Sequence, residues 1–134
     1  MILLGSTGSI GVNTLNIARK FNLNVEVLVA GRNIELLNQQ IKEFKPKKVV
    51  IDKAEDISLV CHDNVSFGEK AILEAIENST SKTVVNALVG FLGLQPTLKA
   101  IECGKKIALA NKESLVVAGK FIDQTKLKPI DSEH

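Results

Sequence analysis

Three glycines spaced three residues apart, Gly5, Gly8 and Gly11, follow directly on an apolar run at the N-terminus, residues 2–4. The run predicts a buried strand, and residues 10–21 after it have the apolar period of a helix. The glycines therefore fall in the turn from a strand into a helix. Gly5 permits the sharp turn, Gly8 lets another group approach the backbone closely, and Gly11 lets the helix pack tightly on the sheet. The segment predicts the first unit of an α/β fold.

The rest of the chain repeats this alternation of short β-branched runs and longer amphipathic stretches. The expected strands are residues 2–4, 25–30, 48–52, 83–88, 106–110 and 127–130. The expected helices are residues 10–21, 34–45, 69–77, 96–103 and 113–125, and residues 56–66 are expected to be a loop with a short strand at 57–60. Because about ten helical residues separate the apolar strands, the strands pair in parallel through right-handed crossovers. The predicted fold class is α/β, a doubly wound, mostly parallel sheet of the Rossmann type with helices on both faces.

The helical periods also predict the side chains that face the sheet. These are Leu15, Ala18 and Phe21 in the first helix, Leu36, Leu37, Ile41 and Phe44 in the second, and Ile72, Leu73 and Ile76 in the third. Asn33 precedes the second helix, and its side-chain carbonyl can accept from the N–H groups of the first turn. Pro96 and Gly104 bracket the fourth helix, with Gly104 as its left-handed stop.

The composition excludes several classes of partner. The 17 Lys and Arg against 15 Asp and Glu give a net charge of only +2, and Trp and Tyr are absent, so we expect no nucleic acid and no membrane as partner. No apolar stretch approaches the roughly 18 residues of a membrane span. The N-terminus has no signal-peptide pattern, so the expected location is the cytoplasm. Cys61 and Cys103 are expected to be free, buried thiols, and Cys61 beside His62 lacks the spacing of metal ligands.

The functional residues of such a sheet are expected where the strands end. Ligands of doubly wound sheets lie outside the carboxyl ends of the strands, at the point where the strand order reverses. There the glycine-rich turn opens a helix whose unpaired N–H groups and partial positive charge favour an anion, and the neighbouring Ser and Thr hydroxyls add donors. No Gly-Lys-Ser or Gly-Lys-Thr closes the turn, which excludes a P-loop. The pattern predicts a dinucleotide diphosphate at this turn; the alternative is a glycine-rich turn without a ligand.

The end of the second strand indicates which dinucleotide binds. NAD-binding domains usually place Asp or Glu about 20 residues after the glycine-rich turn, but this chain has Ala30-Gly31-Arg32-Asn33 there. A carboxylate would repel a 2′-phosphate, whereas Arg32 can pair with it through two charge-assisted hydrogen bonds. Gly31 clears space for the adenosine, and the Asn33 amide can also donate. These residues predict NADPH as the cofactor; the alternative is that Arg32 is a solvated surface residue.

Two further segments follow expected strands at the same edge. Residues 86–90 are small and apolar apart from the first, as suits a segment that lines a flat cofactor ring. Residues 110–114 bring Asn111, Lys112 and Glu113 together at the ligand edge. Lys112 opposes the helix dipole there, so a substrate phosphate or enolate is a plausible partner. The alternative is a helix cap formed by Asn111 with solvated neighbours.

The last residues of the chain contain a pair of carboxylates. Asp131 and Glu133 can converge on one hard cation if a third oxygen ligand joins them; the alternative is a charged tail. The last expected strand stops at its functional end, so we expect a larger protein to continue beyond His134.

In combination these segments resemble the 1-deoxy-D-xylulose 5-phosphate reductoisomerase family of the isoprenoid pathway. The resemblance rests on residues 5–11 (Gly-Ser-Thr-Gly-Ser-Ile-Gly), 30–33, 93–97 (Gly-Leu-Gln-Pro-Thr), 110–114 (Ala-Asn-Lys-Glu-Ser) and 130–134 (Ile-Asp-Ser-Glu-His). Each segment alone has little specificity, but together they stand in the family's order and span nearly the whole chain. Arg32 stands where many relatives have Lys, which keeps the charge.

The resemblance implies an NADPH-dependent enzyme that converts 1-deoxy-D-xylulose 5-phosphate to 2-C-methyl-D-erythritol 4-phosphate in the non-mevalonate isoprenoid pathway. It also implies a divalent metal, Mg²⁺, Mn²⁺ or Co²⁺, which polarises the substrate ketone. By the same resemblance, the NADPH contacts are Thr7, Gly8, Ser9, Ile10, Gly31, Arg32, Asn33, Asn111 and Glu113. The implied substrate ligands are Lys112, Ser132 and Glu133, the metal ligands are Asp131 and Glu133, and the catalytic residues are Lys112 and Glu133.

The family resemblance also divides the chain into two parts. Residues 1–127 are expected to form the NADPH-binding domain, and residues 128–134 are the first residues of a catalytic domain. The remainder of that domain, with another metal-binding carboxylate and a lid, and the family's C-terminal helical domain are not in this sequence. We therefore expect NADPH binding without turnover, and a full-length homodimer that acts on a small phosphorylated sugar.

Two rival interpretations explain part of the pattern. A regulatory NADP(H)-sensing module without catalysis would have the same first two motifs, but it gives no reason for Lys112 or for the two carboxylates near the end. Another NADPH-dependent dehydrogenase, such as one that acts on an amino-acid semialdehyde, would need a catalytic Cys or Lys in a second domain. Neither Cys61 nor Cys103 lies at the carboxyl end of an expected strand.

Overall fold

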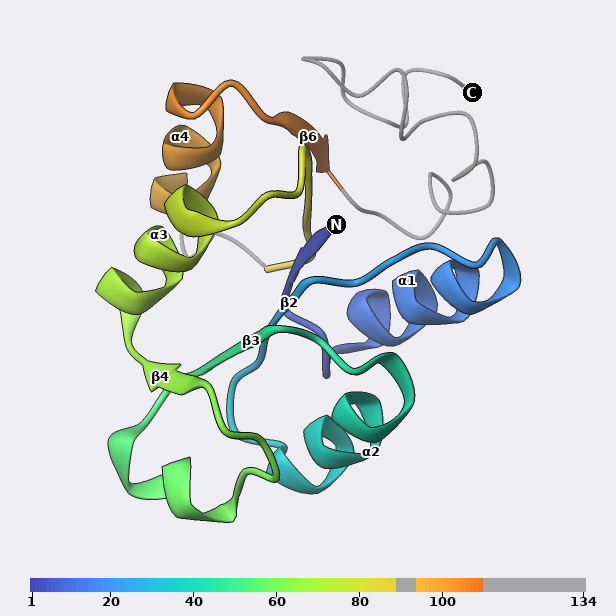
Figure 1. Cartoon of the computed structure of the whole chain (residues 1–134), viewed down its shortest axis with the longest axis vertical. Coiled ribbons are helices and arrows are strands. Elements are labelled where there is room, and N and C mark those ends of the chain that lie inside the picture. Colours follow the sequence, from blue (N-terminus) through green and yellow to red (C-terminus); the bar gives the residue numbers. More distant parts are fainter. Residues whose placement is uncertain (89–93, 110–134) are drawn as a thin grey trace.

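Six short strands and four α-helices follow one another within the part of the chain that the structure describes (Figure 1). The structure is a computed structural model, which describes residues 1–88 and 94–109. The strands are β1 (Ile2–Leu4), β2 (Val27–Val29), β3 (Lys48–Ile51), β4 (Val65–Phe67), β5 (Thr83–Asn86) and β6 (Lys106–Leu109). The helices are α1 (Ser9–Lys20), α2 (Ile34–Phe44), α3 (Glu69–Asn78), α4 (Leu94–Glu102) and the 3-10 helix η1 (Ala54–Leu59).

The strands form one sheet in the order β4-β3-β2-β1-β5-β6, and every pair of neighbours is parallel. The chain builds outward from β1 to β4 on one side and then returns to place β5 on the other side of β1. Leu4 therefore pairs with both Val29 and Asn86. The strand order reverses between β1 and β5, beside the glycine-rich turn. This confirms the expected doubly wound α/β fold.

Two apolar layers hold the helices on the sheet, one on each face. Because successive side chains of a strand point to opposite faces, Leu3 and Leu28 pack with α1 and α2, whereas Ile2 and Val27 pack with α3 and α4. Figure 1 shows the same division, with α1 and α2 on one side of the strands and α3 and α4 on the other. Burial of both faces explains why the strands are continuous apolar runs.

Local signals place the helix ends close to the expected positions. Asn33 Oδ1 accepts from Leu36 N at 3.1 Å, which confirms that Asn33 caps α2. Gly104 follows α4 with φ +74°, the left-handed conformation expected for its stop. Pro96 is the third residue of α4 rather than the first. Proline is tolerated there because the N–H groups of a first turn have no partner within the helix.

Several expected positions are wrong. Residues 57–59 belong to η1 and Val60 follows it, so the expected strand at 57–60 is absent, and the strand Val65–Phe67 was not predicted. The side chains of this edge strand, β4, are only partly buried or exposed, so it lacks the continuous apolar run that predicted β1 and β2. Phe21 follows the last residue of α1 and is 49% exposed. The other expected core residues that are only partly buried are Leu36, Phe44, Ile72 and Leu73.

The two cysteines lie on the surface. Cys61 and Cys103 are free, as expected, but both are exposed rather than buried, because Cys61 follows η1 and Cys103 follows α4.

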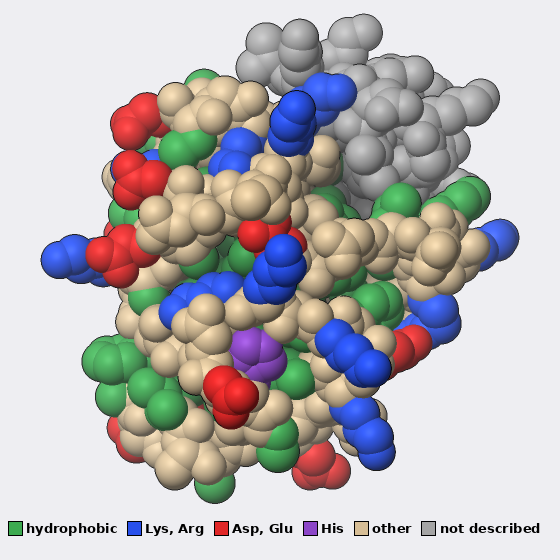
Figure 2. Space-filling model, viewed as in Figure 1, with side chains coloured by type: hydrophobic (Ala, Val, Ile, Leu, Met, Phe, Trp, Pro, Cys, Tyr) green, Lys and Arg blue, Asp and Glu red, His purple; other side chains and the backbone are tan. Residues whose placement is uncertain are grey.

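On the face shown in Figure 2, Lys and Arg side chains lie among Asp and Glu side chains. In the part of the chain that the structure describes, no helix is long and apolar enough to cross a membrane. The expected helix at 113–125 and strand at 127–130 lie outside the described residues.

Candidate functional site

The exits of β1, β2 and β5 lie side by side at the carboxyl edge of the sheet. Gly5 N and Ser6 N both donate to Val29 O, the last carbonyl of β2, at 2.8 and 2.9 Å. These bonds hold the glycine-rich turn against the exit of β2. On the other side of β1, Ala87 N donates to Leu4 O at 2.8 Å. The segments that the sequence singled out after these three strands therefore meet where the strand order reverses.

Close packing inside the turn explains two of its three glycines. Gly5 has φ +87°, and a Cβ there would lie 3.0 Å from Ala87 O. A Cβ on Gly11 would lie 1.9 Å from Gly5 O, so no side chain fits where α1 begins. Gly11 thus allows close packing as expected, although against the turn itself rather than the strands. At Gly8 such a Cβ would have no neighbour nearer than 3.9 Å, so the protein's own packing does not require a glycine there.

The helix α1 presents an unpaired N-terminus to this edge. Its N-cap is Gly8, which has no side chain to cap the helix, and its first turn contains no acidic residue. The first N–H groups of a helix have no partner within it, and the helix dipole gives this end a partial positive charge. Thr7, Ser9 and Ile10 line a surface hollow at this end. The arrangement can hold an anion such as a phosphate group.

The segment after β2 is exposed at the same edge. Gly31, Arg32 and Asn33 are all exposed, and a Cβ on Gly31 would meet no atom within 4 Å. The oxygen of the Asn33 side chain is engaged in capping α2, which leaves its amide nitrogen to donate to a ligand. Within residues 1–88 and 94–109, Arg32 has no ion-pair partner. Its guanidinium is therefore available to an anionic group.

A hollow next to this segment contains two carboxylates that sequence reasoning missed. It is lined by Val29, Ala30, Gly31, Ile51, Asp52, Gly68, Glu69, Ile72 and Leu88. Asp52 follows β3 and Glu69 begins α3, so both can accept hydrogen bonds from a ligand at the carboxyl edge. The rule that ligands lie beyond the strand ends could have found Asp52, because it closes an expected strand. Glu69 gave no such signal, since the strand before it was not predicted.

The exit of β5 is held by its own last residue. Asn86 is buried, and its Nδ2 donates to Thr97 Oγ1 of α4 at 2.7 Å while its Oδ1 accepts from Leu88 N at 3.0 Å. Residues 86–90 are the segment expected to line a cofactor ring. Within it, Leu88 lines the hollow described above. Residues 89 and 90 lie outside the described residues.

The remaining predicted site residues lie outside the described residues: Asn111, Lys112, Glu113, Asp131, Ser132 and Glu133. In the described ranges there is no group of three or more His, Cys, Asp or Glu that could hold a metal ion. The described part of the chain thus includes the residues after β1 and β2 that are predicted to contact a dinucleotide, and these two segments lie at one edge.

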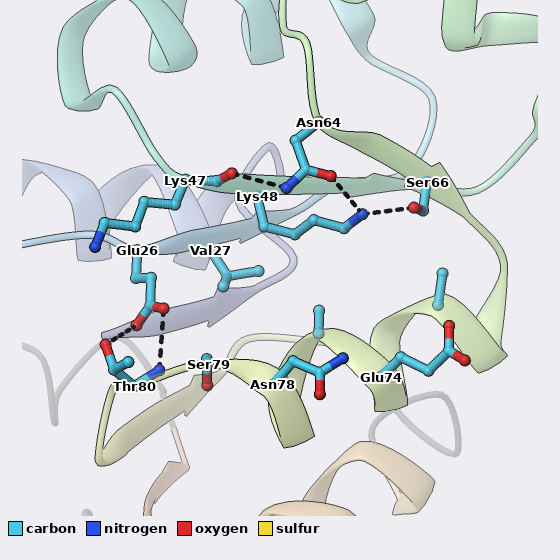
Figure 3. A pocket seen from close by; sticks show the side chains of 12 residues that line it. Glu26, Val27, Lys47, Lys48, Asn64, Ser66, Glu74, Asn78, Ser79 and Thr80 are labelled. Atoms are coloured by element: carbon cyan, nitrogen blue, oxygen red, sulfur yellow. Dashed lines mark hydrogen bonds between the residues drawn. The ribbon is translucent and has the colours of Figure 1, made fainter.

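The amino edge of the sheet has a groove of a different kind (Figure 3). It lies between the starts of β2 and β3 on one side and α3 on the other. On the side of the groove formed by the strands, Lys48 Nζ donates to Asn64 Oδ1 at 2.9 Å and to Ser66 Oγ at 2.6 Å, as the dashed lines in Figure 3 show. This ammonium group is therefore already engaged by neighbouring side chains.

Glu26 is the buried carboxylate of this groove, and four hydrogen bonds engage it. Its Oε1 accepts from Thr80 Oγ1, Ser81 N and Ser81 Oγ at 3.2, 2.8 and 2.5 Å, and its Oε2 accepts from Thr80 N at 3.0 Å. Burial raises the pKa of Glu26, but the hydrogen bonds from Ser81 and Thr80 together lower it by more, so the pKa lies below its ordinary value. The ionised carboxylate ties the loop before β5 to β2, which is a structural role.

Comparison with known proteins gives consistent matches. A family model described as 1-deoxy-D-xylulose 5-phosphate reductoisomerase matches residues 1–119. A protein of that name from Nautilia profundicola is 64% identical over 134 residues, which are 100% of this chain and 37% of the relative. Another from Wolinella succinogenes is 57% identical over 137 residues, which cover 100% of this chain and 38% of the relative. The chain thus spans little more than a third of the length of these curated relatives.

Solved structures have the same fold. A crystal structure of DOX-P reductoisomerase in complex with NADPH, fosmidomycin and magnesium matches with a TM-score of 0.75 at 32% identity, over 93% of this chain and 33% of that one. The 1-deoxy-D-xylulose 5-phosphate reductoisomerase from Zymomonas mobilis in complex with NADPH matches with a TM-score of 0.73 at 33% identity, over 92% of this chain and 35% of that one.

Proposed function

The chain belongs to the 1-deoxy-D-xylulose 5-phosphate reductoisomerase family, and on that basis we propose that it is the NADPH-binding part of such an enzyme. The observation that carries the proposal is the carboxyl edge of the sheet, which combines an uncapped helix N-terminus with an Arg32 guanidinium that has no ion-pair partner among the described residues. The first offers N–H groups to a diphosphate, and the second pairs with a 2′-phosphate. The solved relative in complex with NADPH supports the same assignment.

In this proposal two described segments contact different parts of NADPH. Thr7, Gly8, Ser9 and Ile10 surround the diphosphate, with the open backbone at Gly8 allowing close approach. Gly31, Arg32 and Asn33 take the adenosine ribose and its 2′-phosphate. Beyond the described residues, Asn111 and Glu113 complete the contacts. In this proposal residues 1–127 are the NADPH-binding domain and residues 128–134 open a catalytic domain.

The whole protein, in this proposal, converts 1-deoxy-D-xylulose 5-phosphate to 2-C-methyl-D-erythritol 4-phosphate. NADPH supplies the hydride, and a divalent metal held by Asp131 and Glu133 supplies Lewis acidity. Lys112 and Ser132 bind the substrate, and Glu133 also contacts it. The solved relatives with magnesium and with fosmidomycin support a metal and a phosphorylated sugar as ligands. The full-length enzyme is proposed to be a cytoplasmic homodimer.

Because the chain spans 37% of its relative from Nautilia profundicola, we propose that it binds NADPH but does not turn over substrate by itself. The test is NADPH oxidation by the chain in the presence of 1-deoxy-D-xylulose 5-phosphate and Mn²⁺. We expect none, and oxidation at a steady rate would contradict this part of the proposal.

Cofactor choice is tested by Arg32→Asp, which replaces a 2′-phosphate partner with a repelling carboxylate. Because a hydrogen bond to a charged group contributes about 1.5–3 kcal/mol, the variant should lose about tenfold or more in NADPH affinity. NADH has no 2′-phosphate, so its affinity should change far less. The measurement is a fluorescence titration of the chain with each cofactor.

The matched control for this titration is Lys42→Glu, which reverses a charge on the exposed side of α2, away from the proposed phosphate site. It should leave both affinities unchanged. Equal losses for NADPH and NADH in the Arg32→Asp variant would show that Arg32 does not recognise the phosphate. A wild-type chain that binds neither cofactor would overturn the proposed function as a whole.

A further inference from the structure

A buried glutamine joins the two halves of the proposed cofactor site. Gln40 lies on the sheet-facing side of α2, beside Leu37 and Ile41, and is 6% exposed. Its Nε2 donates to Ser6 O at 2.9 Å, in the glycine-rich turn 34 residues earlier. An apolar side chain is the usual occupant of such a position, because burial of an amide is unfavourable unless its hydrogen bonds are made.

The bond from Gln40 sets the direction of a peptide group in the turn. Ser6 O and Thr7 N belong to one planar peptide unit, in which the C=O and N–H groups point in opposite directions. Ser6 is completely buried, and its carbonyl points to Gln40. The Thr7 N–H therefore points away from α2. Among the described residues no acceptor takes this N–H, so it is available at the edge where the diphosphate is proposed to bind.

The backbone N–H and C=O groups of Ser6 both tie the turn to β2 and α2, which together are called the β2–α2 unit. Ser6 N donates to Val29 O at 2.9 Å, and Ser6 O accepts from Gln40. The same β2–α2 unit carries Arg32 and Asn33 at the N-terminus of α2. Gly5 N also donates to Val29 O, so the turn has two bonds to β2, whereas the bond from Gln40 joins it to α2.

The amide at position 40 leaves one of its own polar atoms without a partner. Among the described residues two buried side-chain oxygens have no hydrogen-bond partner, and they are Ser6 Oγ and Gln40 Oε1. Buried polar atoms without a partner are rare and destabilise a fold. An apolar residue at position 40 would remove one of them. The feature that requires an amide there is the donor to Ser6 O.

We propose that Gln40 is a positioning residue of the cofactor site, which orients the Thr7 N–H toward the diphosphate by holding the Ser6 carbonyl. This inference rests on the proposed NADPH binding and adds a residue to it. NADPH and NADH share the diphosphate, so loss of the Gln40 donor affects both equally. A ligand that has the 2′-phosphate but no diphosphate, 2′-AMP, is not affected.

The experiment compares Gln40→Met with Gln39→Met in the chain. Met has nearly the size of Gln and adapts to buried sites but cannot donate, and Gln39 is its exposed neighbour on the same helix. Gln40→Met should lower the affinities for NADPH and NADH by a similar factor of about ten or more. The affinity for 2′-AMP, measured by NMR titration, should equal that of the wild type, and Gln39→Met should behave as wild type with all three ligands.

A second variant tests the donor directly if Gln40→Met folds poorly. Gln40→Glu has the same shape, but its ionised carboxylate cannot donate. At pH 8 its affinities for NADPH and NADH should fall by a similar factor, while its affinity for 2′-AMP should equal that of the wild type. An unchanged affinity for NADPH would count against the donor.

The possible outcomes separate the two proposals. Wild-type protein without NADPH affinity would overturn the proposed function itself. Wild-type binding together with unchanged affinities in Gln40→Met would overturn the positioning role only. A parallel loss of 2′-AMP affinity would also overturn it, because that result indicates a general structural role for Gln40 in α2.

Discussion

The carboxyl and amino edges of the sheet contain similar polar groups but use them differently. At the amino edge Glu26 accepts four hydrogen bonds, and Lys48 donates to two neighbouring side chains. At the carboxyl edge α1 has no cap, and Arg32 has no ion-pair partner in the described ranges. Groups that bond within the protein stabilise the fold, whereas unused donors remain available to a ligand. The N-terminus of α1 and Arg32 therefore keep donors for a ligand at the edge where the cofactor is proposed to bind.

The largest effect on stability is expected within the glycine-rich turn at the carboxyl edge, where one glycine is needed for packing and another is not. Gly11→Ala places a Cβ 1.9 Å from Gly5 O, so the turn and α1 must move apart. We expect a loss of about 3 kcal/mol in the free energy of unfolding, measured by urea denaturation. Gly8→Ala is the matched variant, because its Cβ has no neighbour nearer than 3.9 Å.

Gly8→Ala should change the free energy of unfolding by no more than about 1 kcal/mol but weaken NADPH binding, since the Cβ occupies space proposed for the diphosphate. The two alanine variants thus separate packing from ligand approach in one turn. If both had the same stability, the close contact of α1 with the turn would be disproved.

The next largest effect is expected at the amino edge. Glu26→Gln leaves partly buried donors of Thr80 and Ser81 without a charged acceptor, which should cost about 2 kcal/mol at neutral pH. NADPH affinity should not change, because the groove lies at the opposite edge. A large loss of NADPH affinity would break the contrast between the two edges.

The same variant has a specific pH dependence. The pKa of Glu26 is lower in the folded chain than its ordinary value of 4.5. Its contribution to stability is therefore fully present above pH 4.5 and is lost as the pH falls through the folded pKa. Urea unfolding from pH 7 to pH 3 should show the gap between wild type and Glu26→Gln closing at the acid end. Glu55→Gln, an exposed change on η1, should show no gap at any pH.

The smallest effect on stability is expected for Asn33→Asp. Asp keeps the oxygen that caps α2, and its charge is favourable at a helix N-terminus, so the free energy of unfolding should change by about 0.5 kcal/mol or less. The change removes the amide donor and places a carboxylate near the proposed 2′-phosphate, so NADPH should bind about tenfold more weakly while NADH changes less. Unchanged NADPH affinity would remove Asn33 from the proposed site.

Local signals in the sequence predicted much of the fold, and they also predicted the turn after β1 and the helix cap after β2 at the carboxyl edge. The turn at Gly5 and the cap at Asn33 depend on residues within a few positions of each other, so the pattern was sufficient. The prediction was wrong where few side chains are buried, as at residues 57–60 and at Val65–Phe67, because such segments have no clear apolar pattern. Phe21 was misplaced because the apolar period continues past the last residue of α1, where the side chain no longer faces the sheet.

The sequence by itself determined the alternation of strands and helices, the parallel sheet and the edge at which a dinucleotide is proposed to bind. Only the tertiary structure decided that Gln40 reaches Ser6 and that Glu26 holds Thr80, because these partners are 34 and 54 residues apart. Periodicity and turn chemistry act over a few residues, whereas such pairs depend on the strand order β4-β3-β2-β1-β5-β6. That order brings residues distant in the sequence side by side.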